Sequence, residues 1–299
     1  MTIALAERLP PEMFLSELPP MAEDTERMAA PLAPLHTAAL LQIDGASVLL
    51  PGGRRIGPFD LRVDAGERIA ILGPSGAGKS TLLRLLAGER APHEGGVALA
   101  GRALSDWPLP ALARRRAVLP QSHAVAFGLP VALVVALGRV ARESDRDQAD
   151  IVAAALQWAQ AAHLDGRRFD TLSGGEQARV QLARVFAQLW DERDALLLVD
   201  EPLAALDPGL QFELMDAMHA FCRARGHALA AVLHDINQAL SSFDRLWLLR
   251  DGRLRADLPS GRSAIGPLEA LYGIGLRCVE DDGGTLAVLP VRQATTVTA

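Results

Sequence analysis

A glycine-rich segment, Gly73-Pro74-Ser75-Gly76-Ala77-Gly78-Lys79-Ser80-Thr81, constrains this chain more than any other feature of its sequence. It fits the pattern G-x-x-x-x-G-K-[ST], follows an apolar run at 69–72 and precedes a helical pattern at 81–88. Glycines let backbone N–H groups curl around phosphates, and the start of a helix adds the positive end of its dipole. In this pattern the lysine reaches the β- and γ-phosphates and Ser80 ligates Mg²⁺. The segment therefore predicts a phosphate-binding loop between a strand and a helix.

The usage of basic residues supports this interpretation. Lys79 is the only lysine among 30 basic residues, and all the others are arginine. A lone lysine indicates a place where a compact point charge cannot be replaced by a planar guanidinium. The net charge of −6 gives no overall basic field for nucleic acid or anionic lipid, so we expect any membrane contact to run through a partner.

Four short apolar runs are each followed directly by a glycine or a polar residue. These are 69–72 before Gly73, 117–120 before Gln121, 196–199 before Asp200 and 230–233 before His234. Such runs suit strands buried on both faces, and ligands of parallel sheets bind beyond the carboxyl ends of the strands. The runs alternate with helical stretches, which predicts an α/β fold with a largely parallel sheet. We expect the four groups to converge on one edge of it.

Two adjacent acids follow the run at 196–199. Asp200 suits an Mg²⁺ held through water, and Glu201 suits the orientation and deprotonation of an attacking water. The alternative is an ordinary solvated acidic turn.

A second glycine-rich turn, Leu172-Ser173-Gly174-Gly175-Glu176-Gln177, opens an amphipathic helix. A Ser-Gly-Gly turn at a helix N-terminus is a second candidate anion site. The alternative, structural interpretation is a capping box, with Ser173 as N-cap and Glu176 as its partner.

Taken in order, these segments resemble the ATP-binding-cassette (ABC) transporter ATPases over about residues 40–258. The matching motifs are Walker A at 73–81, the Q-loop at Gln121, the signature LSGGE at 172–176, Walker B at 195–201, the D-loop Ala205-Leu206-Asp207 and the switch histidine His234. The resemblance implies a P-loop NTPase fold of ABC ATPase type, with a mostly parallel core, an antiparallel β part and a small helical subdomain at about 122–180.

Three parts of the chain are expected from this resemblance and from composition. Residues 1–38, rich in Pro, Ala and Glu, are predicted to be a disordered N-terminal extension. The ABC ATPase domain is predicted at 39–258, ending in a hairpin around Asp251-Gly252. A C-terminal extension at 259–299 is predicted to form a short helix from about Ile265 and a second hairpin at 282–284.

The resemblance also implies a head-to-tail homodimer that sandwiches ATP and Mg²⁺ between one subunit's Walker A and the other's signature. Walker A, Ser173, Gly174, Gly175 and Asp207 would contact the nucleotide. The implied catalytic residues are Glu201, His234, which contacts the γ-phosphate, and Gln121, which touches metal and reports to the membrane partner. The implied metal ligands are Ser80, Gln121 and Asp200.

The implied partners are polytopic membrane permease subunits and, indirectly, a substrate-binding protein, with no nucleic acid. No secretory signal or spanning segment is evident in the sequence, so we expect a peripheral protein on the cytoplasmic face of the inner membrane. One departure concerns the adenine, which the family usually stacks on an aromatic residue. Here the corresponding position is Leu50.

Within the family, segments 101–107, 112–121 and 180–185 are most similar to hemin-import ATPases. The C-terminal Leu271-Tyr272-Gly273 is similar to the hemin, vitamin B12 and ferric-siderophore group. Since such an ATPase does not touch the cargo, hemin import is expected from likeness alone. The alternatives are a cobalamin or ferric-siderophore importer ATPase, or a soluble ABC ATPase acting on nucleic acid or the ribosome.

Overall fold

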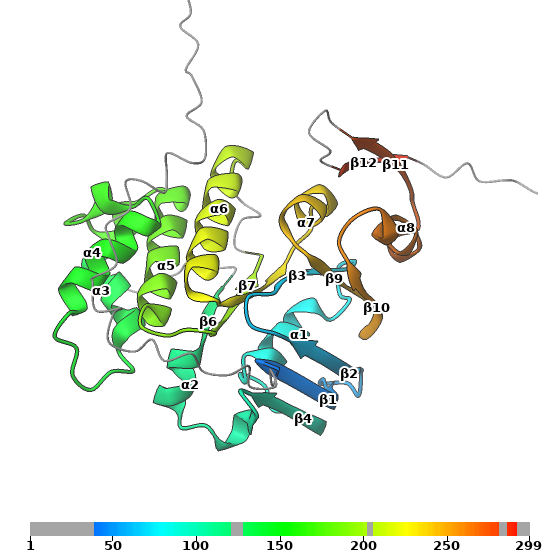
Figure 1. Cartoon of the computed structure of the whole chain (residues 1–299), viewed down its shortest axis with the longest axis horizontal. Helices are drawn as coiled ribbons and strands as arrows, with labels where there is room; N and C mark the ends of the chain where they lie inside the picture. Colours follow the sequence, from blue (N-terminus) through cyan, green and yellow to red (C-terminus); the bar gives the residue numbers. More distant parts are fainter. Residues whose placement is uncertain (1–38, 121–127, 202–205, 281–285, 292–299) are drawn as a thin grey trace, which may run out of the picture. The chain divides into compact units, whose positions relative to one another are not determined.

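The computed structural model describes residues 39–120, 128–201, 206–280 and 286–291 (Figure 1). The predicted N-terminal extension therefore lies outside the described residues, as do Gln121 and Ala205. The part of the chain that is described contains no helix long and apolar enough to cross a membrane.

A six-stranded sheet forms the centre of the fold. From edge to edge its strands are β10 (Arg253–Pro259), β9 (Arg245–Arg250), β3 (Arg68–Leu72), β8 (Ala228–Val232), β7 (Leu196–Asp200) and β6 (Arg116–Leu119). All neighbours pair in parallel except β10, which closes the predicted hairpin with β9. The four predicted apolar runs are thus the adjacent strands β3, β8, β7 and β6, and the largely parallel sheet is confirmed.

The register of these strands decides where their ends lie. Ile71 pairs with Val232, and Val232 pairs with Asp200. The residues that follow β3, β7 and β8 therefore emerge at the same edge of the sheet. This edge is where ligands of parallel sheets bind.

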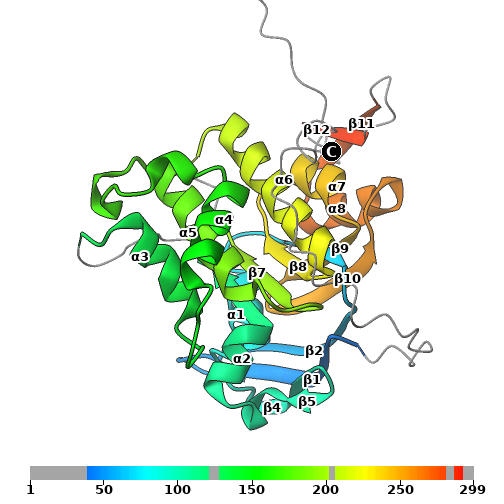
Figure 2. The same cartoon turned by 60° about the vertical axis from the view of Figure 1, so that its left-hand side comes forward.

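A second, antiparallel sheet confirms the expected β part. Its strands, in order, are β2 (Arg55–Val63), β1 (Leu41–Leu49), β4 (Glu94–Leu99) and β5 (Arg102–Ala103). In both views it lies on the side of the central sheet that carries α1 (Figures 1 and 2). The turn between β1 and β2 places Leu50 beside the glycine-rich loop.

Eight α-helices surround these sheets in the described chain. They are α1 (Lys79–Leu86), α2 (Leu109–Arg115), α3 (Val131–Ala136), α4 (Gln148–Trp158), α5 (Gly174–Leu189), α6 (Pro208–Arg225), α7 (Ile236–Ser242) and α8 (Ile265–Tyr272). Short 3-10 turns are η3 (Leu104–Asp106), η4 (Leu137–Arg139), η5 (Ala162–Leu164), η6 (Phe169–Thr171) and η7 (Arg262–Ala264).

Alternation along the strands divides the core into two layers. Ile69 and Ile71 of β3 face α1 and the antiparallel sheet, whereas Ala70 and Leu72 face the layer that contains α5 and α6. Successive strand residues point to opposite faces, so a sheet covered on both sides needs an unbroken apolar run. This is why the runs carry no hydrophobic and polar alternation.

Helices α3, α4 and α5 pack together to one side of the sheet (Figure 2). Buried Arg139, from the chain between α3 and α4, donates to Asp145 and to Asp191 just after α5, each at 2.6 Å. The helical subdomain was predicted at about 122–180, but α5 continues without a break to Leu189. The subdomain boundaries remain a prediction.

The C-terminal extension follows the predicted pattern of a helix and then a hairpin. After α8, strands β11 (Gly275–Glu280) and β12 (Leu286–Val291) pair antiparallel, and their turn lies outside the described residues. Asn237 of α7 anchors the hairpin, because its amide donates to Val288 O at 3.2 Å and accepts from Val288 N at 2.7 Å.

Candidate active site

The glycine-rich loop joins β3 to α1 as predicted. Gly76 and Gly78 adopt left-handed backbone angles, with φ of 74° and 104°, which glycine tolerates without strain. At Gly73 a side chain would collide with strand β9, since an added Cβ would lie 2.2 Å from Leu249 O. The glycines thus serve the turn and its close packing on β9.

Lys79 is buried at the first position of α1, with only 6% of its surface exposed. Its Nζ donates to Gly73 O at 2.8 Å and to Pro74 O at 3.4 Å. Burial lowers the pKa of Lys79, while the nearby carboxylates of Glu201 and Asp200 oppose that shift. The ammonium is therefore held inside the loop, where phosphates bind in loops of this type.

Ser80 and Asp200, two of the predicted metal ligands, are hydrogen-bonded to each other. The Ser80 hydroxyl donates to Asp200 Oδ1 at 3.1 Å across the start of α1 and the end of β7. Burial raises the pKa of Asp200, and the Ser80 hydrogen bond opposes that shift. A hydroxyl and a carboxylate oxygen suit Mg²⁺, which takes few protein ligands and completes its shell with water and substrate phosphates. The described residues contain no cluster of three or more His, Cys, Asp or Glu side chains that could hold a metal.

Glu201 and His234, predicted separately, lie in contact. His234 Nε2 is 2.6 Å from Glu201 Oε1, and the imidazole side chain is half exposed. Glu201 has a φ of 48°, a left-handed angle that is unfavourable for any residue other than glycine. Such strain clusters at functional sites, because the surroundings must hold it in place. The backbone of Glu201 thus aims its carboxylate across to the end of β8.

Most of these residues, though not Gly73, Pro74 or Asp200, line one pocket of about 330 Å³. Its walls are Ser75, Gly76, Ala77, Gly78, Lys79, Ser80 and Thr81 of the loop, Glu201 and His234, and Leu50, Arg54 and Ile56 of the β1–β2 hairpin. Leu50, which was singled out from the sequence, is therefore part of the pocket that the glycine-rich loop lines. Arg54 and Ile56 were missed by sequence reasoning, although Gly52-Gly53 before Arg54 signals a turn that could present a side chain.

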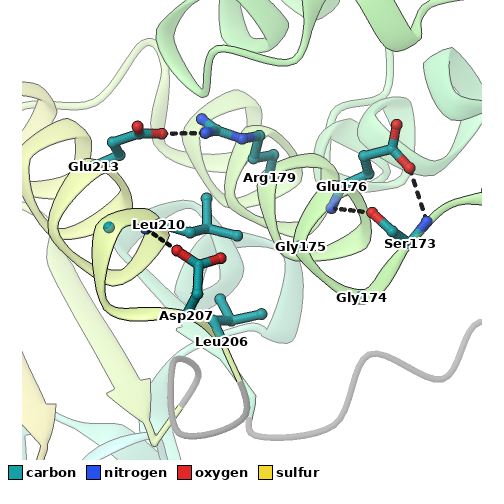
Figure 3. Close-up of a pocket in the computed structure, with 10 residues that line it drawn as sticks. Ser173, Gly174, Gly175, Glu176, Arg179, Leu206, Asp207, Leu210 and Glu213 are labelled. Carbon is teal, nitrogen blue, oxygen red and sulfur yellow. Dashed lines mark hydrogen bonds and ion pairs between the residues drawn. The ribbon is translucent and has the colours of Figure 1, made fainter. Parts of the chain in front are cut away.

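The Ser-Gly-Gly turn lines a different pocket, of about 600 Å³ (Figure 3). Ser173 Oγ accepts from Glu176 N at 3.3 Å and Glu176 accepts from Ser173 N at 2.8 Å, so the predicted capping box is present. Gly174 has open space where a side chain would stand, whereas a Cβ on Gly175 would lie 2.4 Å from Leu210 Cδ2. The turn therefore caps the start of its own helix through these hydrogen bonds, and it also lines the pocket.

Asp207 stands on the facing side of the same pocket as the N-cap of α6, where its carboxylate accepts from Leu210 N at 3.0 Å (Figure 3). Arg179 and Glu213, which sequence reasoning missed, form an ion pair between α5 and α6. The predicted nucleotide-binding residues are thus divided between two pockets, except Gly73 and Pro74, which line neither. Among the residues that the structure describes, no residue lines both.

This site defines a class of protein, the P-loop ATPases of the ATP-binding-cassette type. Its features are a strand followed by a glycine-rich loop with a buried lysine, a serine that faces an aspartate, and a second glycine-rich turn. The sequence profile described as "ABC transporter" matches residues 56–204, and the chain belongs to this family of ATPases.

Relatives of known name cover most of the chain. It is 45% identical over 238 residues to the hemin import ATP-binding protein HmuV of Pseudomonas aeruginosa, which covers 79% of this chain and 93% of the relative. The identity is 46% over 239 residues with the protein of the same name from Nocardia farcinica, covering 77% and 81%.

Solved structures share the fold. A metal-chelate type ABC transporter in an inward-facing conformation is 21% identical with a TM-score of 0.71, covering 87% of this chain and 99% of that one. A dimeric ATP-binding cassette in a post-hydrolysis state with ADP and Pi is 23% identical with a TM-score of 0.65, covering 74% and 99%.

Proposed function

We propose that this chain is the ATP-binding and hydrolysing subunit of an ABC importer whose cargo is hemin. The division of the predicted nucleotide-binding residues between two pockets of one chain carries the mechanistic part of this proposal. A nucleotide held by one pocket needs the other pocket from a second subunit. Two chains related by a twofold axis would therefore form two complete sites.

In the first pocket, Lys79 and the loop amides bind the phosphates. The ammonium exchanges the carbonyls of Gly73 and Pro74 for phosphate oxygens, which is a short movement because Nζ already lies inside the loop. Ser80, Asp200 and Gln121 would hold Mg²⁺, which neutralises charge on the phosphates when bound. Gln121 lies outside the described residues, so the only support for its role as a metal ligand is its position in the sequence just after β6.

Glu201 and His234 act at the far end of the phosphates. The Glu201 carboxylate takes the proton from the attacking water, and its constrained backbone keeps it in place. His234 Nε2, now 2.6 Å from Glu201 Oε1, contacts the γ-phosphate. Their contact supports a shared task, since a group that orients water and a group that holds the phosphate must lie within reach of the same oxygen atoms.

In the second pocket, Ser173 and the amides of Gly174 and Gly175 engage the γ-phosphate held by the partner subunit. The start of α5 provides free N–H groups and the positive end of a 16-residue helix dipole. Asp207 lies across the same pocket and contacts the nucleotide from the α6 side. Closure of the dimer would thus depend on ATP.

The membrane partners follow from this role. A subunit of this kind couples its closure to polytopic permease subunits on the cytoplasmic face of the inner membrane, with a substrate-binding protein on the other side. The identity of 45% to a hemin import ATP-binding protein supports hemin as cargo. Cobalamin and ferric siderophores are the alternatives, because no pocket of this chain needs to contact the cargo.

The cargo is tested by deleting the gene and growing the strain on hemin, a ferric siderophore or cobalamin as the sole source. We expect growth on hemin to be lost, to return with the wild-type gene and to stay lost with Lys79→Ala. Loss of growth on the siderophore or on cobalamin alone would reassign the cargo. Unchanged growth on all three would contradict the importer function.

A further inference from the structure

The turn between β1 and β2 supplies part of the wall of the pocket of about 330 Å³ that the glycine-rich loop lines, here called the P-loop pocket. Leu50 and Arg54 come from this turn, and Ile56 from the start of β2. None of the residues that line this pocket in the described chain is a phenylalanine, tyrosine or tryptophan. This part of the wall therefore offers a purine base the aliphatic side chains of Leu50 and Ile56 and the guanidinium group of Arg54.

The exposed side chain of Arg54 is hydrogen-bonded to the glycine-rich loop. Its Nη2 donates to Gly76 O at 2.7 Å. The turn beneath it is closed by Leu50 N donating to Arg54 O at 2.8 Å and by Gly53 N donating to Leu50 O at 3.1 Å. Gly52 and Gly53 supply the left-handed angles, with φ of 86° and 79°. The position of Arg54 is thus set by the backbone on one side and by the loop on the other.

The chemistry of this group suits a planar base. A guanidinium stacks on aromatic faces and attracts their π-electrons, and its hydrogen bonds lie in its own plane. The hydrogen bond to Gly76 O uses one of five N–H donors and leaves both faces of the plane without a hydrogen bond. The loop amides and Lys79 already provide for the phosphates, so Arg54 is available to the base.

We propose that Arg54, together with Leu50, forms the base-binding surface of this nucleotide site, with the guanidinium stacked on the purine. This inference rests on the proposed function in one respect, because it needs a nucleotide with its phosphates in the glycine-rich loop. It deepens that function by assigning to Arg54 the task of stacking on the base, which relatives usually give to an aromatic side chain.

The test compares ATP with tripolyphosphate, which has the phosphates but no base. Affinities of the purified full chain for each probe are measured by calorimetry in the presence of Mg²⁺. We expect Arg54→Ala to weaken ATP binding by about three- to thirtyfold, as a lost cation–π contact would. Tripolyphosphate binding should stay within about twofold of wild type. Arg277→Ala, at an exposed arginine of β11, is the matched control and should change neither affinity.

Arg54→Gln separates the base contact from support of the loop. Glutamine keeps an N–H donor for Gly76 O but lacks the guanidinium plane, so we expect the same loss of ATP affinity as with alanine. Wild-type affinity in Arg54→Gln would show that Arg54 only supports the loop and would overturn the proposal. Equal weakening of ATP and tripolyphosphate would make Arg54 a phosphate ligand, and no change in either would also overturn it. If the wild type binds neither probe, the proposed function itself has failed.

Discussion

Lys79 shows how much the site depends on single side chains. It lies under the loop with its Nζ 2.8 Å from Gly73 O, and it is the only lysine in the chain. The sequence predicted this residue, Ser80 and Asp200 from motif spacing alone. It did not predict the contact of Glu201 with His234 or the place of Arg54, because these depend on how distant segments are brought together by the sheet register and the β1–β2 turn.

Lys79→Ala should abolish ATP hydrolysis and leave the fold intact, since a small residue fits under the loop but cannot neutralise the phosphates. Lys79→Arg should fail as well, because a planar guanidinium does not fit where a point charge is buried. Steady-state phosphate release measures both, with circular dichroism to check folding. Turnover within tenfold of wild type in Lys79→Ala would contradict the role of the loop.

The buried imidazole of His227 should make stability depend on pH. Burial lowers the pKa of His227 from 6.5 to about 4, and its Nδ1 accepts from Ala195 N at 3.0 Å. Between these two values the unfolded chain binds a proton that the folded chain does not, so stability falls as the pH falls. Since a pKa difference of one corresponds to about 1.4 kcal/mol, His227 alone should remove roughly 2 kcal/mol between pH 7.5 and 5.0.

His227→Asn keeps an acceptor for the Ala195 amide but does not titrate in this range. Guanidinium unfolding at the two pH values should show a loss of stability on acidification that is roughly 2 kcal/mol smaller than in the wild type. The variant is expected to be less stable at both values, so the difference between them is the readout. An equal loss in the two proteins would show that His227 is not the titrating group.

Whole elements were predicted better than their contacts. Four unbroken apolar runs identified the parallel strands because a sheet covered on both faces admits no polar residue. The boundary of the helical subdomain was less well defined, since α5 continues through the predicted limit as far as Leu189. The docking of the C-terminal hairpin on α7 could not be predicted, because the pairing of the Asn237 side chain with the backbone of Val288 leaves no pattern in the sequence.

Asn237→Ala should loosen the hairpin of β11 and β12 without unfolding the domain. It removes two hydrogen bonds to Val288, each worth about 1 kcal/mol, so hydrogen exchange of the Val288 amide should accelerate by about tenfold or more. Asn237→Asp is the matched control, because it keeps the acceptor for Val288 N and loses only the donor to Val288 O. Unchanged exchange in Asn237→Ala would mean that the hairpin is held by its other contacts.

At the scale of the whole molecule, the residues that we propose to bind nucleotide line two separate pockets of one chain. The P-loop pocket contains the phosphate loop and the acid and histidine, whereas the start of α5 faces a separate pocket with Asp207. The sequence placed both motifs on helix N-termini but did not determine that they would line different pockets. The family resemblance supplied that expectation, and the geometry of the described residues agrees with it.

Light scattering of Glu201→Gln, with and without ATP and Mg²⁺, tests the central claim most directly. Glutamine keeps the size of the side chain and removes the base, so ATP binds but is not hydrolysed, and we expect a dimer that forms only with ATP. Adding Ser173→Arg should return the protein to a monomer, because its bulk and charge occupy the place of the partner's phosphate. Hydrolysis by Glu201→Gln at the wild-type rate would show that Glu201 is not the base. An ATP-dependent dimer that survives Ser173→Arg would contradict a shared site between two subunits.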